Sequence, residues 1–138
     1  MIEIKHKRTG EVLLRIDSSE TVGLQLEGSK LTAANLAGMN LAGAKLSWSD
    51  LHNADLQGAS LQGAVLRSCV LRGANMKDCD LRGCDLTDAD LSGCDLTGAI
   101  LVKATLHFTK LVGANLSMAD LREAELSMAD LRAVLREA

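Results

Sequence analysis

A leucine stands at every fifth position from Leu26 to Leu131, with Met76 as the single exception. An α-helix turns about 100° per residue, so side chains five apart would differ by about 140° and form no stripe. A β-strand alternates its faces at every residue, so an odd period would send successive leucines to opposite sides. All these leucines can share one interior only if the chain bends once per repeat. Such a chain winds into a solenoid in which each turn pairs with the next.

The other positions of the repeat agree with this interpretation. Two residues before the central leucine, Ala fills 13 of the 22 positions, Cys 4 and Ser 2, and the remaining three are Leu24, Met39 and Thr109. Residues two apart point to the same side, so the small residue also faces inward. Glycine fills 10 of the 22 positions two residues after the centre, where a turn needs backbone freedom. The residues directly beside the centre are mostly polar and should face water.

These units resemble the A(D/N)LXX repeat of the pentapeptide-repeat family. Residues 54–58 read Ala-Asp-Leu-Gln-Gly, residues 74–78 read Ala-Asn-Met-Lys-Asp, and residues 89–93 read Ala-Asp-Leu-Ser-Gly. The resemblance covers roughly residues 24–131. It implies an all-β chain, a right-handed quadrilateral β-helix with four pentapeptides per coil. The 22 centres would then form about five and a half coils.

The two ends depart from the repeat, and we expect both to cap a single domain of 138 residues. Residues 1–23 predict a β-hairpin and a lead-in, because two alternating apolar segments flank a turn-like stretch at residues 8–11. Residues 24–127 predict the β-helix. Residues 128–138 predict a short helical cap, since residues 127–130 resemble a capping box and an apolar stripe follows. The alternative, that residues 116–131 continue the coil, is left open by the near-duplicate segments after Leu116 and Leu126.

Composition limits the partners and the compartment. The net charge is −3 and 24% of the residues are charged, so we expect no direct nucleic-acid binding. Aromatic residues are nearly absent, unlike in a conventional sandwich or α/β domain. No apolar run approaches the length of a membrane span, and the N-terminus lacks the apolar core of a signal peptide. We therefore expect a cytoplasmic protein that does not enter a membrane.

The residues that could carry chemistry do not form a recognisable site. The cysteines are spaced by 10, 5 and 10 residues, which are multiples of the repeat, and each takes the small inward position: Cys69, Cys79, Cys84 and Cys94. We expect buried, inert thiols and neither a disulfide nor a metal site. The three histidines are isolated from one another along the chain, and no nucleophile elbow or phosphate-binding loop occurs. We predict no enzyme activity, no cofactor and no metal.

Charged residues form two neighbouring rings. Basic residues follow four successive centres: Arg67, Arg72, Lys77 and Arg82. An acidic belt comes next: Asp78, Asp80, Asp85, Asp88, Asp90 and Asp95. Ion pairing between adjacent coils on a solvated face is the favoured interpretation, at about 0–1 kcal/mol per pair. The alternative is an acidic surface for a basic partner.

Several apolar residues fall at positions that should face outward: Trp48, Ile100, Val102, Phe108, Val112 and Met128. A concentrated set of this kind is typical of a contact surface. We predict a protein-interaction surface here, used for a partner or for a homodimer.

The first functional hypothesis is a non-enzymatic scaffold or protein-interaction module of the bacterial cytoplasm, with an unknown protein partner. The alternative comes from the family resemblance, because some pentapeptide-repeat proteins mimic DNA, bind DNA gyrase and protect it from quinolones. DNA mimicry requires a nearly continuous acidic stripe. The column Asp50, Val70, Asp90, Lys110 and Asp130 is interrupted. An enzyme ranks third.

Overall fold

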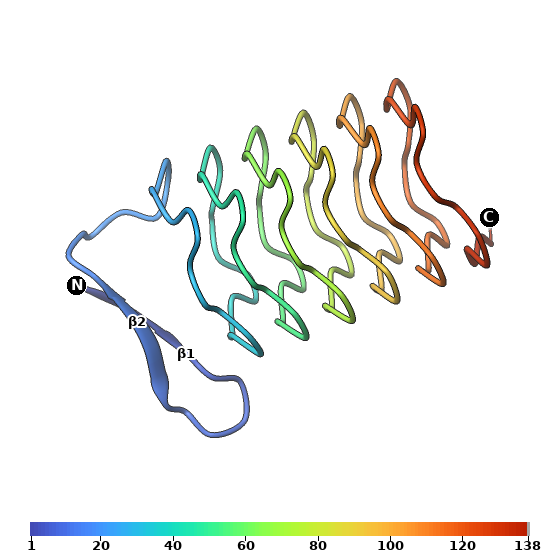
Figure 1. Cartoon of the computed structure of the whole chain (residues 1–138). Coiled ribbons are helices and arrows are strands. Elements are labelled where there is room, and N and C mark those ends of the chain that lie inside the picture. Colours follow the sequence, from blue (N-terminus) through green and yellow to red (C-terminus); the bar gives the residue numbers. More distant parts are fainter. Residues whose placement is uncertain (138) are drawn as a thin grey trace.

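The computed structural model describes residues 1–137, which form a β-hairpin followed by a tower of stacked coils (Figure 1). The hairpin consists of β1 (Ile2–Lys5) and β2 (Val12–Ile16), paired antiparallel. The coils contain isolated parallel bridges and no extended strand within the described residues, because each side of a coil is only a few residues long. The hairpin predicted from the sequence is confirmed.

Every bridge of the tower joins residues that are 20 apart. The series runs from the pair Gln25–Lys45 to the pair Asn115–Leu135. The Asp55 N–H, for example, donates to the carbonyl of Ala34 in the coil below at 2.9 Å. Four pentapeptides therefore make one coil, and the predicted right-handed quadrilateral β-helix is confirmed.

The central leucines and the small residues two positions earlier fill the interior. Every centre from Leu31 to Leu116 is at most 2% exposed. Ala89 and Leu91 are both fully buried, as expected for residues that point to the same side. The narrow interior explains why bulky leucines alternate with alanine-sized side chains.

The hairpin covers the N-terminal end of the tower. Ile4 of β1 is 1% exposed, and Leu13, Leu14 and Ile16 pack against the same core. An antiparallel bridge joins His6 to Ala34 at the edge of the first coil. The hairpin thus supplies the cap that a solenoid end needs.

The predicted helix over residues 128–138 is wrong for the part that the structure describes, because residues 126–137 continue the coil. The Leu116 N–H donates to the Leu135 carbonyl at 2.7 Å, and the Met118 N–H donates to the Glu137 carbonyl at 2.8 Å. Met128 has a φ of 60°, which no α-helix accommodates. The coil below offers a hydrogen-bonding edge, whereas an isolated helix of about eleven residues is marginal in water. Residue 138 lies outside the described residues.

The last coil is consequently open on one side. Leu131 is 44% exposed and Leu135 is 59% exposed, while Leu121 and Leu126 are half-buried. The backbone N–H groups of the central residues Leu121, Leu126 and Leu131 find no acceptor within residues 1–137. No helix that could cross a membrane occurs in the same stretch of chain.

Candidate interaction surfaces

Each repeat turns a corner of the tower through the same hydrogen bond. The N–H three residues after the centre donates to the carbonyl of the centre, as from Ala54 to Leu51 at 2.9 Å. The residue two after the centre has a positive φ, which is the requirement at the third position of a type II turn. Where this residue is not glycine, its side chain stands at a corner of the tower.

The predicted apolar set divides into two groups. Three members occupy corner positions and are well exposed: Trp48 by 72%, Phe108 by 56% and Met128 by 76%. The other members lie beside the centres and are half-buried between neighbouring coils: Ile100, Val102 and Val112. Phe108 and Met128 are 20 residues apart, so they occupy the same corner in adjacent coils. Trp48 shares that corner three coils away, and the structure does not bring it to the other two.

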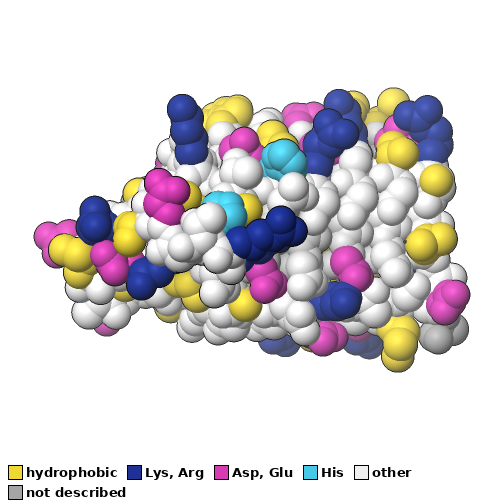
Figure 2. Space-filling view, turned by 90° about the horizontal axis from the view of Figure 1, so that it is seen from below, with side chains coloured by type: hydrophobic (Ala, Val, Ile, Leu, Met, Phe, Trp, Pro, Cys, Tyr) yellow, Lys and Arg dark blue, Asp and Glu magenta, His cyan; other side chains and the backbone are white. Residues whose placement is uncertain are grey.

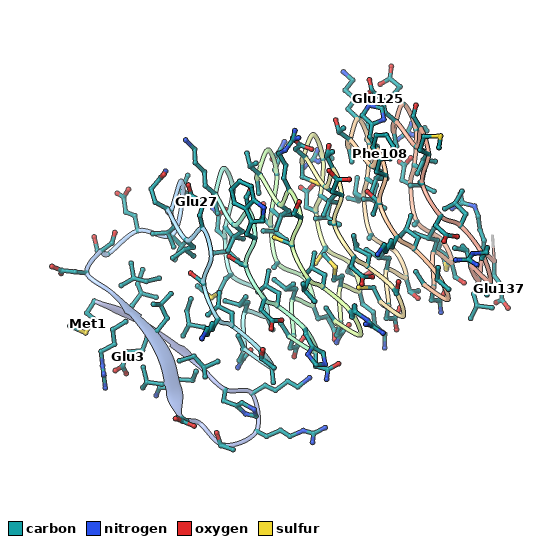
Figure 3. All side chains as sticks on the ribbon, in the orientation of Figure 1. Met1, Glu3, Glu27, Phe108, Glu125 and Glu137 are labelled. Atoms are coloured by element: carbon teal, nitrogen blue, oxygen red, sulfur yellow. The ribbon has the colours of Figure 1, made fainter. Side chains whose placement is uncertain are left out.

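Exposed large apolar side chains are concentrated near the C-terminal end. Five of the nine in the described chain lie between residues 108 and 135. We call them the C-terminal apolar set: Phe108, Met118, Met128, Leu131 and Leu135. Figure 3 labels Phe108 beside Glu125 on the upper corner of the last coils. The sequence indicated Phe108 and Met128, whereas Leu131 and Leu135 were assigned to a helix and their exposure was missed.

Four aspartates of the acidic belt stand directly before a centre and make a hydrogen bond within their own repeat: Asp80, Asp85, Asp90 and Asp95. A carboxylate directly before the centre accepts the N–H directly after it. Asp80 accepts the Arg82 N–H at 3.2 Å, and Asp90 accepts the Ser92 N–H at 3.0 Å. This Asx-type hydrogen bond explains why the repeat prefers Asp or Asn before the leucine.

The basic ring pairs with the belt across one step of the coil. Arg67 lies 3.3 Å from Asp85. The next two pairs are longer, with Arg72 at 3.8 Å from Asp90 and Lys77 at 3.6 Å from Asp95. The fourth base, Arg82, pairs within its own turn with Asp80 at 2.6 Å. Both partners of each pair are partly solvated, so each contributes about 0–1 kcal/mol.

Hydrogen bonds lower the pKa of three carboxylates of the belt: Asp80, Asp85 and Asp95. The Arg82 side chain, through its hydrogen bonds, lowers the pKa of Asp80. Partial burial raises the pKa of Asp85, but the Thr87 hydroxyl, the Thr87 N–H and the Arg67 charge together outweigh it, and the net shift is downward. The same balance lowers the pKa of Asp95. The belt is a set of stabilised, mostly paired carboxylates.

The four cysteines line the interior as predicted. The Sγ of Cys69, for example, donates to the carbonyl of Leu46 in the coil below at 2.8 Å. Ser49 and Thr109 occupy equivalent positions and donate through their hydroxyls in the same way. Burial raises the pKa of Cys79 to about 12, as it does for the other three thiols: Cys69, Cys84 and Cys94. The thiols therefore fill the small inward position that alanine fills in most repeats. No metal-binding cluster of His, Cys, Asp or Glu occurs within residues 1–137.

Sequence reasoning missed a concave region where the β1–β2 loop meets the tower. Residues of the loop line a concavity of about 280 Å³ together with Ala33 and Asn53. Asn53 also lines a neighbouring concavity of about 490 Å³ with His52 and Arg72. The periodicity carries no signal for this region, because it does not tell where the hairpin loop lies against the coils.

The β-helix built from five-residue units places the chain in a defined class of solenoid proteins. The family model for pentapeptide repeats matches eight copies, over residues 22–58, 49–88, 59–98 and 99–135. The chain belongs to the pentapeptide-repeat family. No curated protein sequence matched it.

Solved structures of the same family resemble the chain over most of its length. A pentapeptide repeat protein from the cyanobacterium Cyanothece 51142 is 26% identical, with a TM-score of 0.62, over 86% of this chain and 91% of that protein. A pentapeptide repeat protein of the Arabidopsis thaliana thylakoid lumen is 31% identical, with a TM-score of 0.50, over 73% of this chain and 67% of that protein. The plasmid-mediated fluoroquinolone resistance protein QnrB1 is 20% identical, with a TM-score of 0.41, over 86% of this chain and 68% of that protein.

Proposed function

We propose that this chain is a non-enzymatic scaffold that binds another protein through its C-terminal apolar set. The observation that carries the proposal is the concentration of exposed apolar side chains in the last two coils. Covering a large apolar side chain contributes about 1.5–3 kcal/mol, so this set offers substantial binding energy. The polar side chains nearby are engaged in turn hydrogen bonds and ion pairs, which favours a structural over a catalytic use.

A second copy of the chain is the first partner to test. Self-association through one patch around a two-fold axis needs no other protein, and two-fold dimers are the commonest assemblies. Phe108 and Met128 stand at one corner in adjacent coils and would supply its centre. We expect light scattering to show a dimer at high concentration and Phe108→Asp to shift it toward the monomer.

The matched control adds the same charge at the same corner outside the apolar set. Ser68 has a φ of 57° and occupies the position of Phe108 two coils earlier. Asp already occupies that position at Asp88, so both variants should fold. We expect Ser68→Asp to associate like the wild type. Equal association of all three proteins would contradict the homodimer, and a pull-down comparing wild type with Phe108→Asp would then test for a different protein partner.

A DNA mimic that binds gyrase or another DNA-binding protein is the alternative. In such a mimic the acidic belt would take the place of the DNA phosphates. Asp85, Asp90 and Asp95 are paired with basic side chains, which makes DNA mimicry the less favoured function. A gyrase supercoiling assay with and without the protein distinguishes the two functions, since a scaffold should leave the supercoiling rate unchanged.

The proposed compartment is the bacterial cytoplasm. A relative with this fold comes from the thylakoid lumen, so the fold by itself does not determine the compartment. Fractionation of cells expressing the protein tests the location.

A further inference from the structure

The loop between β1 and β2 is fixed against one side of the tower. The Lys7 N–H donates to the Ala33 carbonyl at 2.8 Å, and the Asn35 N–H donates to the Lys5 carbonyl at 2.8 Å. The Lys7 ammonium donates to the carbonyl of Asn53, one coil further on. The loop is therefore held at two successive coils, and its side chains keep a defined position over the turns below.

Two further loop side chains line this region: Arg8 is exposed and His6 is half-buried. The Nδ1 of His6 accepts the N–H groups of Arg8 and Thr9 at 3.1 and 3.2 Å. The other ring nitrogen, Nε2, is then the donor of the imidazole. Arg8 has no ion-pair partner within residues 1–137. Both side chains are thus free to receive a ligand.

The loop and the tower together line two depressions that share Asn53, and we call the two jointly the basic cleft. Its first part, of about 280 Å³, is lined by His6, Lys7, Arg8, Ala33 and Asn53. Its second part, of about 490 Å³, is lined by His52, Asn53, Val70, Arg72, Gly73, Ser92 and Gly93. Asn53 belongs to both parts, so they adjoin. Figure 2 shows histidine and basic side chains gathered near the hairpin end of this face.

The cleft is positive in a chain whose net charge is −3. Three cationic side chains and two histidines line it, and no carboxylate does. Two carboxylates contact residues that line the cleft. Asp90 stays 3.8 Å from Arg72, and Asp50 accepts the backbone N–H of His52 at 3.1 Å. Lys7 and Arg8 have no ion-pair partner within residues 1–137, so the attraction for an anionic ligand is strongest at the loop end of the cleft, and at Arg72 the ligand would compete with Asp90.

A backbone donor adds to these charges. In most repeats an Asp or Asn before the centre accepts the N–H directly after it. Val70 takes that place here and has no acceptor, so the Arg72 N–H remains without a partner within residues 1–137. Val70 and Arg72 both line the cleft, and an incoming carboxylate can accept this N–H.

The shape of the cleft favours a linear ligand. From the turn at Ala33 to the turn at Gly93 it crosses three steps of the coil, or about 14 Å at about 4.8 Å per step. An extended peptide covers that distance with about four residues. No aromatic side chain lines the cleft, whereas single-stranded nucleic acid is bound by stacking on aromatic rings. We propose that the basic cleft binds an extended, acidic peptide segment of a partner protein.

The test is a fluorescence anisotropy titration with a labelled peptide of five alternating Glu and Asp residues. We expect saturable binding that weakens as salt is added. The double variant Arg8→Gln and Arg72→Gln should weaken binding at least about tenfold, because it removes two of the three cationic groups. In a spectrum of ¹⁵N-labelled wild type, the amide signals that shift most should include those of Arg8, Arg72 and Gly73.

The matched controls separate this site from general charge and from the C-terminal apolar set. Lys45 is an exposed base outside the cleft, so Lys45→Gln should bind the peptide like the wild type. Phe108→Asp should also leave peptide binding unchanged, whatever it does to self-association. Absence of saturable binding, equal weakening in Lys45→Gln, or tighter binding of an oligothymidylate than of the peptide would each overturn the proposal.

Discussion

Leu31 and Leu131 occupy the same side of the tower five coils apart, yet their environments differ completely. Leu31 is fully buried and Leu131 is 44% exposed. Both follow the same repeat pattern, so their own pentapeptides do not explain the difference. Leu31 lies beneath the hairpin that contributes Ile4 to the core, while Leu131 has a neighbouring coil on one side only. Burial in this fold depends on what lies above and below a repeat more than on the repeat itself.

This comparison shows how stability is distributed along the tower. Each inner coil exchanges hydrogen bonds and apolar contacts with two neighbours, and the last described coil does so with one. In a solenoid, stability is approximately a sum of repeat terms and nearest-neighbour interface terms. We therefore expect the C-terminal end to open first and the hairpin end to open with the whole molecule.

The largest expected effect comes from truncating equivalent leucines at the two ends. Leu31→Ala leaves a cavity in a closed interior and should cost about 2–5 kcal/mol. Leu131→Ala removes a side chain that is already partly in water and should cost about 1 kcal/mol or less. Urea unfolding measures both values. Leu71→Ala, in a middle coil of the same side, should resemble Leu31→Ala, and equal losses in all three variants would contradict the comparison.

Acid should reveal the same difference between the ends. The pKa values of Asp120 and Asp130 near the C-terminus are lowered by hydrogen bonds from the side chains of Arg122 and Arg132. Because the pKa values are lower in the folded chain, the ionised carboxylates stabilise it above the unfolded pKa of about 3.9. This contribution is lost as the pH falls through the lower folded values, so the thermal midpoint should drop below about pH 4.

The order of loss on acidification can be read with two signals. Circular dichroism follows all coils, while the fluorescence of Trp48, the single tryptophan, follows the N-terminal part. The dichroism should change before the fluorescence if the C-terminal coil opens first. Asp130→Asn keeps the oxygen that accepts the Arg132 N–H and removes the charge. The early change in the dichroism on acidification should therefore be smaller in this variant. Coincident transitions would argue that both ends are equally stable.

The smallest effect concerns backbone strain at the corners. Six of the seven corner residues between positions 103 and 133 are not glycine, although all have a positive φ. Gly38 and Met118 share one corner column, four coils apart, and a Cβ at Gly38 would meet no atom within 4 Å. Gly38→Ala should therefore cost about 1 kcal/mol for conformation alone. Met118→Gly should stabilise by less than about 1 kcal/mol, since the greater freedom of the unfolded chain offsets part of the gain. Differential scanning calorimetry measures both changes in stability. If Met118→Gly destabilised the protein, the Met118 side chain would have to make a stabilising contact.

The coil could be predicted from the sequence because its period is incompatible with helix and strand alike. The C-terminal helix was predicted wrongly because residues 127–130 satisfy two local patterns at once. A capping box contributes only about 1 kcal/mol. Continuing the coil gives the chain hydrogen bonds from Leu116 and Met118 and an inward position for Val134. Leu135 looked one residue early for a centre because it occupies the bridging position before the next one.

The ion pairs between adjacent coils follow from the length of a coil, whereas the basic cleft was missed. Residues 18 apart, such as Arg67 and Asp85, follow from the coil length, so their pairing can be worked out from the numbering. That Arg8 and Arg72 line adjoining depressions depends on the angle at which the hairpin leaves the tower. No repeat encodes that angle, since it results from a few hydrogen bonds such as the one between Lys7 and Ala33.

The coil of four pentapeptides has a consequence for how such a molecule can change over generations. Inserting one pentapeptide between residues 93 and 108 would present the core with an unaltered pattern. It would also rotate every later side chain by a quarter turn relative to every earlier one. Inserting four would restore the alignment and lengthen the tower by a single step. The angle between the basic cleft and the C-terminal apolar set therefore changes in quarter turns, and each further set of four repeats lengthens their separation by one step without changing that angle. A scaffold of this kind can reposition its binding surfaces by changing only the number of its repeats.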